Sequence, residues 1–190
     1  RMKILKPFLD IGKQLFEGSA SFCDYFLLCI AFKIQFPRRK HPFTFTLMGK
    51  QGTGKTMFMD AIGRVFGAHH YYCTANPEDF FGTHAEGFDH CLFAVMNELE
   101  GAQMIGLQGK MNYAFITKTT NKTNPEKIDQ ISGDRRNVAA KSTDVYLGKL
   151  YTESFWTRLN AHFHSPEFIR CLYDYLNNTD LSRIDWKMLR

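Results

Sequence analysis

The sequence predicts an α/β protein built on a parallel β-sheet, and three observations support this. From residue 43 onward, strand-like and helix-like segments alternate along the chain. Residues 91–96 are apolar without interruption, which is typical of a central parallel strand buried on both faces. Glycines at 49, 52 and 54 stand between a strand pattern and a helix pattern, as a tight turn between them requires. We expect helices on both faces of the sheet and short helical segments flanking it.

The first segment, residues 1–40, is expected to be a helical lead-in. Ser19 or Ser21 is suited to cap a helix that runs to Ala31, and Pro37 ends the helical region. Asp24 and Lys33 closely bracket the most apolar stretch of this helix, so it indicates a buried helix and not a membrane span. No secretory hydrophobic region follows the first residues, and we expect a protein that is intracellular and not secreted.

The second and third segments are expected to hold the sheet and a helical end. Residues 41–150 form the predicted core, and its strands are expected at 43–48, 70–74, 91–96, 113–117 and 137–140. We expect the end of strand 91–96 to lie beside the glycine-rich loop, and strand 113–117 to lie next to that loop. Residues 151–190 have helical spacing, with Phe155, Leu159 and Phe163 on one face.

Length and composition fit one globular domain with a small helical addition. The chain has 190 residues, and 44% of them are hydrophobic, enough for a substantial core. The net charge of +5 permits a nucleic-acid partner but does not require one. The five cysteines are scattered and form no C-x-x-C pair, so neither a disulfide framework nor a zinc site is indicated.

The sequence Gly49-Lys50-Gln51-Gly52-Thr53-Gly54-Lys55-Thr56 fits the pattern G-x-x-x-x-G-K-[ST], the phosphate-binding loop of nucleoside triphosphatases. Backbone N–H groups of such a loop and the positive end of the following helix both favour a phosphate. Lys55 is expected to reach the β- and γ-phosphates of ATP, and the Thr56 hydroxyl to bind Mg²⁺. The residues expected to hold ATP are Gly49, Gln51, Gly52, Thr53, Gly54, Lys55 and Thr56.

Two polar residues, Asn97 and Glu98, end the apolar strand. A phosphate-loop enzyme needs a carboxylate here to complete the Mg²⁺ site and to polarise the attacking water. Glu98 is our candidate for both tasks, and the alternative is that it caps the next segment. Asn97 stands where an aspartate is usual; it brings no charge, so we expect it to be a weaker metal ligand.

Further candidate residues lie closer to the C-terminus. Asn121 follows a strand and is suited to orient water or to sense the γ-phosphate. Arg135 or Arg136 is expected to act as an arginine finger on the nucleotide of a neighbouring subunit, and the alternative is a surface role. The lysines expected on loops that contact DNA are Lys110, Lys118 and Lys122. Such lysines are also common on solvated surfaces.

The segments 49–56, 91–98, 115–121 and 133–136 together resemble the superfamily 3 helicase domain, above all the poxvirus-type primase-helicase ATPases of large DNA viruses, phages and mobile elements. The resemblance covers roughly residues 20–185 and implies an AAA+-like core that uses ATP and Mg²⁺. It also implies a homo-oligomeric ring, expected to be a hexamer, that moves along single-stranded DNA at a replication fork. A viral protein of this kind would work in the host cytoplasm or nucleus, and a primase domain elsewhere on the full-length chain would be in keeping with the family.

One departure from the family keeps other functions open. Family members usually have a longer stretch with a DNA-contacting hairpin where this chain has only residues 101–112. A phosphate-loop ATPase that acts as a switch or packaging motor, without unwinding, is therefore an alternative. A nucleotide-binding oligomerisation module with weakened catalysis is another, which Glu98 argues against and Asn97 keeps open.

Overall fold

In the computed structural model of the chain, residues 1–41, 44–76, 79, 90–98, 114–121, 137–145 and 152–182 are described. Among them, a five-stranded parallel sheet has the order β2-β3-β4-β1-β5. Its strands are β1 (Thr44–Met48), β2 (Tyr71–Thr74), β3 (Phe93–Met96), β4 (Phe115–Thr120) and β5 (Asn137–Lys141). The sheet confirms the predicted α/β class and the expected strands, with shifts of a few residues at their ends.

β4 lies between β1 and β3 in the sheet. β4 pairs with β1 through Leu47 and Thr119, and with β3 through Val95 and Thr117. β4 therefore lies directly beside β1, the strand that leads into the glycine-rich loop, as we expected, and β3 lies one strand further away. β4 also continues past residue 117 to Thr120, because its alternating threonines are β-branched and suit a strand buried on both faces. This extension brings Asn121 directly to the end of the strand.

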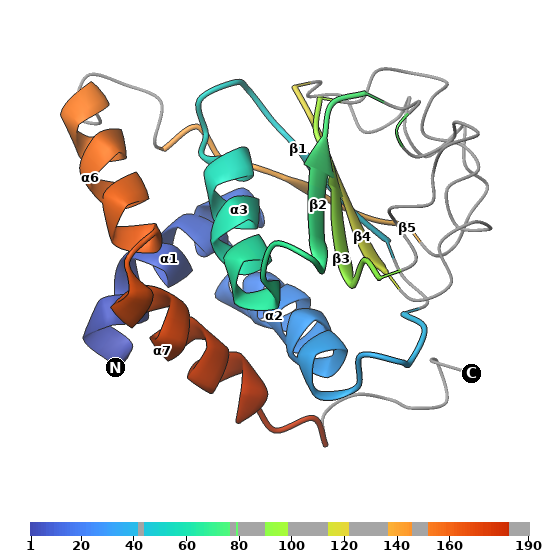
Figure 1. The fold of residues 1–190 in the computed structure, drawn as a ribbon. Coiled ribbons are helices and arrows are strands. Elements are labelled where there is room, and N and C mark those ends of the chain that lie inside the picture. The colour runs from blue at the N-terminus through green and yellow to red at the C-terminus, as the bar shows by residue number, and fades with distance from the viewer. Residues whose placement is uncertain are drawn as a thin grey trace.

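The described helices are α1 (Met2–Leu15), α2 (Ala20–Gln35), α3 (Lys55–Phe66), α6 (Glu153–Phe163) and α7 (Pro166–Asn177). They all lie on one side of the sheet (Figure 1) and supply one of the two helical layers that we predicted. Ser19, one of our two candidates, caps α2 by accepting a hydrogen bond from the Phe22 N–H at 3.2 Å. α2 then continues past Ala31 to Gln35.

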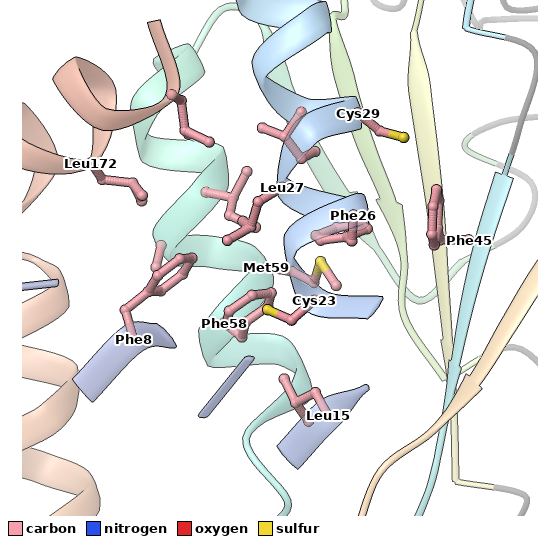
Figure 2. Close-up of a cluster of buried hydrophobic side chains, with 14 of the residues drawn as sticks. Phe8, Leu15, Cys23, Phe26, Leu27, Cys29, Phe45, Phe58, Met59 and Leu172 are labelled. Carbon is pink, nitrogen blue, oxygen red and sulfur yellow. The ribbon is translucent and has the colours of Figure 1, made fainter. Parts of the chain in front are cut away.

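Phenylalanine rings fill the space between this helical layer and the sheet. Phe58 of α3 stacks on Phe8 of α1 with ring centroids 4.4 Å apart, and Phe26 of α2 meets Phe45 of β1 edge-on at 5.0 Å. Figure 2 shows these side chains converging from three helices and a strand. The same cluster of buried residues extends to Leu181 beyond α7. It fixes α3, and with it the glycine-rich loop, against the sheet.

The apolar stretch at residues 26–32 belongs to α2 and is mostly buried in this core, as predicted. Among the described residues, no single helix is long and apolar enough to cross a membrane. Only α1 and α2 taken together meet the length and composition of a span, and the pair is bent by 110° at the break between them.

Candidate functional site

The glycine-rich loop connects β1 to α3 at the carboxyl end of the sheet. Because the strands are parallel, the residues that follow β1, β3 and β4 meet at this same edge. A pocket of about 460 Å³ opens there. Its lining consists of Gln51, Gly52, Thr53, Gly54, Lys55, Thr56, Met57, Asn97, Glu98, Thr119, Asn121, Trp156, Thr157 and Asn160. The pocket thus brings together the central part of the predicted loop and the polar ends of two strands.

The three glycines of the loop all have positive φ, a conformation that favours glycine over other residues, and for Gly52 φ is 83°. Gly49 has φ 146° and Gly54 has φ 91°. A Cβ atom on Gly49 would collide with the Ser142 hydroxyl, and one on Gly54 would lie 3.2 Å from the Trp156 ring. The loop is therefore packed tightly between the end of β5 and α6, and it has little freedom to change shape.

The N-terminus of α3 is open toward the pocket. Gly54 is its N-cap residue and has no side chain to bond the first N–H groups. By contrast, Ser19 and Ser165 cap α2 and α7 with their hydroxyls. The free N–H groups and the positive end of the helix dipole make such a terminus a favourable place for an anion. Lys55, Thr56 and Met57, the first residues of α3, line the pocket.

The Lys55 side chain is buried inside the loop, with only 6% of the residue exposed. Its Nζ donates to the carbonyl oxygens of Gly49 at 2.7 Å and Lys50 at 2.9 Å, and to Asn121 Oδ1 at 3.3 Å. Burial lowers the pKa of Lys55 below its usual range, and the negative charge of Glu98 acts in the opposite direction. No carboxylate in the described part of the chain forms a salt bridge with this ammonium. Its positive charge is therefore available to an anionic ligand.

Asn97 links the end of β3 to both neighbouring parts of the site. Its Oδ1 accepts hydrogen bonds from Thr56 Oγ1 at 3.2 Å and from Thr119 Oγ1 at 2.6 Å. Thr119 Oγ1 in turn accepts from the Glu98 N–H at 3.3 Å. Thr119 was not among the predicted site residues, because a threonine inside a strand carries no local signal of function. The network holds the strand ends in register with the start of α3.

Glu98 lines the pocket in a strained backbone conformation, with φ 56°. A side chain of this size in the left-handed region costs about 1–3 kcal/mol and persists only where the surrounding structure enforces it. Residues of this kind cluster at active and binding sites. The conformation is an observation, independent of the sequence pattern, that favours a functional role for Glu98.

The oxygen atoms of Thr56, Asn97 and Glu98 suit a magnesium ion that is bound mainly through the phosphates of a nucleotide. Thr56, Asn97 and Glu98 bring a hydroxyl, an amide oxygen and a carboxylate to the pocket. Mg²⁺ prefers oxygen ligands and usually takes one or two carboxylates, with water and phosphate oxygens completing its shell. Within the described residues, no group of three histidine, cysteine or acidic side chains is placed to hold a metal by itself.

The opposite wall of the pocket comes from α6, which our sequence analysis did not connect with the loop. Trp156, Thr157 and Asn160 of this helix line the pocket. The predicted apolar stripe of α6 is confirmed, since Leu159 and Phe163 are buried. The stripe shows which face of the helix packs on the core. It does not show which part of the molecule the adjacent face of α6 contacts, because that contact depends on the tertiary arrangement.

The prediction that Lys118 lies on a loop is wrong. Lys118 lies within β4 and is 7% exposed, because the strand continues past the point where we expected it to end. Lys110, Lys122, Arg135 and Arg136 lie outside the described residues.

No protein-family model matches the chain, and no curated protein matches it. Solved structures do match in fold. An apo structure of the C-terminal region of NrS-1 gives a TM-score of 0.67 at 18% sequence identity, and its A form gives 0.69 at 17%. Both matches cover 95% of this chain but only 47% and 46% of the NrS-1 chains, so the chain spans about half their length. At this identity the likeness concerns the fold alone: the chain is similar in fold to about half of the NrS-1 C-terminal region.

Proposed function

We propose that the chain is a phosphate-loop ATPase domain of the superfamily 3 helicase type, which hydrolyses MgATP to move along DNA during viral or mobile-element replication. One observation carries this proposal. Lys55 and Thr56, at the open start of α3, share a pocket with Glu98 and Asn121 from the ends of β3 and β4. The pattern of residues 49–56 and the fold similarity to the NrS-1 C-terminal region support it further.

Binding of the triphosphate follows from the charges at the loop. The phosphates accept hydrogen bonds from the uncapped N–H groups at the start of α3. Lys55 exchanges its contacts with the neutral carbonyls of Gly49 and Lys50 for contacts with anionic oxygens, which are stronger. Mg²⁺ bound with the nucleotide neutralises part of the phosphate charge, and Thr56, Asn97 and Glu98 are the residues that would hold it.

Hydrolysis requires a water molecule between Glu98 and the γ-phosphate. Neighbouring strands lie about 4.8 Å apart, so the insertion of β4 between β1 and β3 leaves space at the sheet edge for this water. Glu98 accepts a proton from the water as its oxygen bonds to the γ-phosphorus and the bond to the β–γ bridging oxygen breaks. The products are ADP and inorganic phosphate. Asn121, at the end of β4, is placed to orient the water or to sense the γ-phosphate.

A second function is favoured by the neutral side chain of Asn97. Among the described residues that line this wall, Glu98 is the single carboxylate, and one carboxylate holds a divalent cation more weakly than two. A nucleotide-dependent switch, a packaging motor or an oligomerisation module with slow turnover would tolerate such a site. These functions differ from the helicase in one measurable respect, the stimulation of ATP hydrolysis by single-stranded DNA.

The test is ATP hydrolysis measured with and without single-stranded DNA, for the wild type and two matched variants. Glu98→Gln keeps the shape and hydrogen bonding of the side chain but lowers its basicity, so it should bind ATP and fail to hydrolyse it. Glu100→Gln makes the same change two residues further along and should hydrolyse ATP normally. Normal turnover by Glu98→Gln would remove Glu98 as the base. Turnover that DNA does not stimulate would favour the switch or packaging motor.

Assembly and DNA contact complete the proposal. A ring, expected to be a hexamer, would allow Arg135 or Arg136 to act on the ATP of the next subunit, and Lys110 and Lys122 to contact DNA. Subunits with Arg135 and Arg136 changed to alanine and subunits with Lys55→Ala, each inactive alone, should partly restore hydrolysis when mixed. No recovery in mixtures shown to co-assemble would exclude the action in trans.

A further inference from the structure

We propose that α6 supplies the nucleobase-binding wall of the pocket, with Trp156 stacking on the base and the Asn160 amide bonding its edge. This inference rests on the proposed function, because it assigns the second end of the same ligand. It extends that function to a region of the chain that the phosphate-loop pattern does not include.

The pocket has two chemically different walls. The wall formed by the ends of β3 and β4 contains Asn97, Glu98, Thr119 and Asn121, which are a carboxylate, a hydroxyl and two amides. The wall formed by α6 contains an indole ring. A nucleoside triphosphate is likewise charged at one end and flat and aromatic at the other. The glycine-rich loop lies between the two walls, so phosphates bound there leave the base on the α6 side.

Trp156 is positioned for this role by its contact with the loop. Two atoms of its ring lie 3.2 Å from the position that a Cβ on Gly54 would take. The ring therefore approaches the backbone where α3 begins. Phe155 meets it edge-on, with centroids 5.2 Å apart, and limits its movement. The half-buried indole lines the pocket. Aromatic side chains in such positions bind bases by stacking on their faces.

Asn160 lies one helical turn beyond Trp156, and residues at this spacing share one side of a helix. It is exposed and lines the pocket, and within the described part of the chain its amide forms no hydrogen bond. An amide offers both donor and acceptor, a pairing that matches the edge of adenine. Thr157, the third residue of this wall, already donates its hydroxyl to the Glu153 carbonyl at 2.9 Å. Ser154, on the same helix, is exposed and is not among the described residues that line the pocket, so it provides the control.

The test compares the binding of ATP with that of inorganic tripolyphosphate, which has no base. Trp156→Leu keeps an apolar side chain but removes the aromatic face, and it should weaken ATP binding by roughly 5- to 100-fold. The same variant should bind tripolyphosphate as the wild type does. Trp156→Phe should recover most of the ATP affinity. Asn160→Ala should weaken ATP binding without affecting tripolyphosphate, and Ser154→Ala, a truncation on the same helix outside the pocket lining, should change neither.

The outcomes separate this inference from the proposed function. If the wild type binds neither ATP nor tripolyphosphate, the proposed function is wrong. If it binds both, and Trp156→Leu and Asn160→Ala leave ATP binding unchanged or weaken both ligands equally, the nucleobase wall is wrong and the phosphate site stands. Asn160 is exposed, so its variant reports on the wall even if Trp156→Leu fails to fold.

Discussion

Two buried lysines show how differently two regions of this molecule use the same side chain. Lys33, in the last turn of α2, is fully buried and donates to the carbonyl oxygens of Pro37 at 2.7 Å and Arg39 at 3.0 Å. Lys55, in the first turn of α3, also donates to two carbonyl oxygens, those of Gly49 and Lys50. Burial lowers the pKa of both lysines. Lys33 ties the segment that follows α2 to the end of that helix, whereas Lys55 lines an open pocket.

The surroundings of the two lysines explain the difference. Near Lys33 the backbone has ordinary conformations, and the aromatic core packs around α2. Near Lys55 three glycines and Glu98 have positive φ, and α3 begins without a side-chain cap. Among the described residues, the first region has no unfavourable backbone conformation, whereas the second has a strained residue, Glu98, and a helix without a side-chain cap. Proteins retain such locally unfavourable features mainly at functional sites. We therefore expect Lys33 to contribute to stability and Lys55 to activity.

The largest expected effect is on catalysis by the loop lysine. Lys55→Ala removes the charge directed at the phosphates and should lower the rate of ATP hydrolysis by about 10²–10³-fold, equivalent to roughly 3–4 kcal/mol of transition-state stabilisation. Because Lys55 lines a pocket that is open to solvent, its truncation leaves no closed cavity, and the free energy of unfolding should change by less than about 1 kcal/mol. Steady-state kinetics measures the rate of ATP hydrolysis, and urea unfolding measures the free energy of unfolding. A variant that loses both activity and stability would make Lys55 a structural residue like Lys33.

The converse effect is expected for the helix lysine. Lys33→Ala leaves a cavity where the fully buried side chain packed and removes the donor to the carbonyl oxygens of Pro37 and Arg39, and it should lower the free energy of unfolding by about 3 kcal/mol. Binding of ATP should be unchanged under conditions where the variant is folded. Urea unfolding measures the first quantity and calorimetric titration the second. A stable variant with weakened ATP binding would reverse the assignment of the two lysines.

The pKa of Lys33 gives a smaller effect that depends on pH. Burial lowers this pKa to about 8, below its value in the unfolded chain, which is about 10.4. Between these values the unfolded chain binds more protons than the folded one, so stability from this group rises with pH. Relative to Lys33→Met, the wild type should gain about 2 kcal/mol between pH 8 and pH 10.

The Lys33→Met comparison is needed because other groups titrate in the same range. Burial raises the pKa of Cys23 and Cys29 to about 12, so above their unfolded pKa these thiols lower stability as pH rises. Both thiols are present in the wild type and in the variant, and their effect cancels in the difference. A difference that stays flat from pH 8 to pH 10 would show that Lys33 keeps an ordinary pKa.

The smallest effect concerns the strained backbone at Glu98. Glu98→Gly relieves the positive φ and should raise the free energy of unfolding by about 1 kcal/mol or less, because the unfolded chain also gains freedom. Glu98→Gln keeps the strain and should leave stability unchanged. Both variants should lose hydrolysis. Equal stability of the glycine and glutamine variants would show that the conformation at residue 98 is not strained.

The sequence was sufficient to predict the parts of the site that are close together along the chain. The loop, the helix after it, and the polar residues at the ends of two strands follow patterns that span fewer than ten residues. The strand order was not predictable in this way, because the apolar run of β3 gives no sign of which strand it pairs with. Lys118 was misplaced for a similar reason, since β4 continues through threonines that also suit a loop.

The α6 wall of the pocket was the part of the site that the sequence could not supply. About a hundred residues separate Gly54 from Trp156, and only the tertiary arrangement brings the Trp156 ring close to the backbone at Gly54. Helical periodicity identified the buried stripe of α6, because burial repeats along the helix. A contact made by one residue with a distant loop leaves no such repeat. The role proposed for Trp156 therefore depends on the structure.

The most direct test of the account is calorimetric titration of MgATP into the wild type, Lys55→Ala and Lys33→Met at one pH and salt concentration. The contrast between the two lysines predicts that the wild type and Lys33→Met bind with the same affinity. It predicts that Lys55→Ala binds at least about tenfold more weakly, because a charge-assisted contact with the phosphates is lost. Equal affinity of all three proteins, or weaker binding by Lys33→Met alone, would contradict the assignment of the pocket as a nucleotide site built around Lys55.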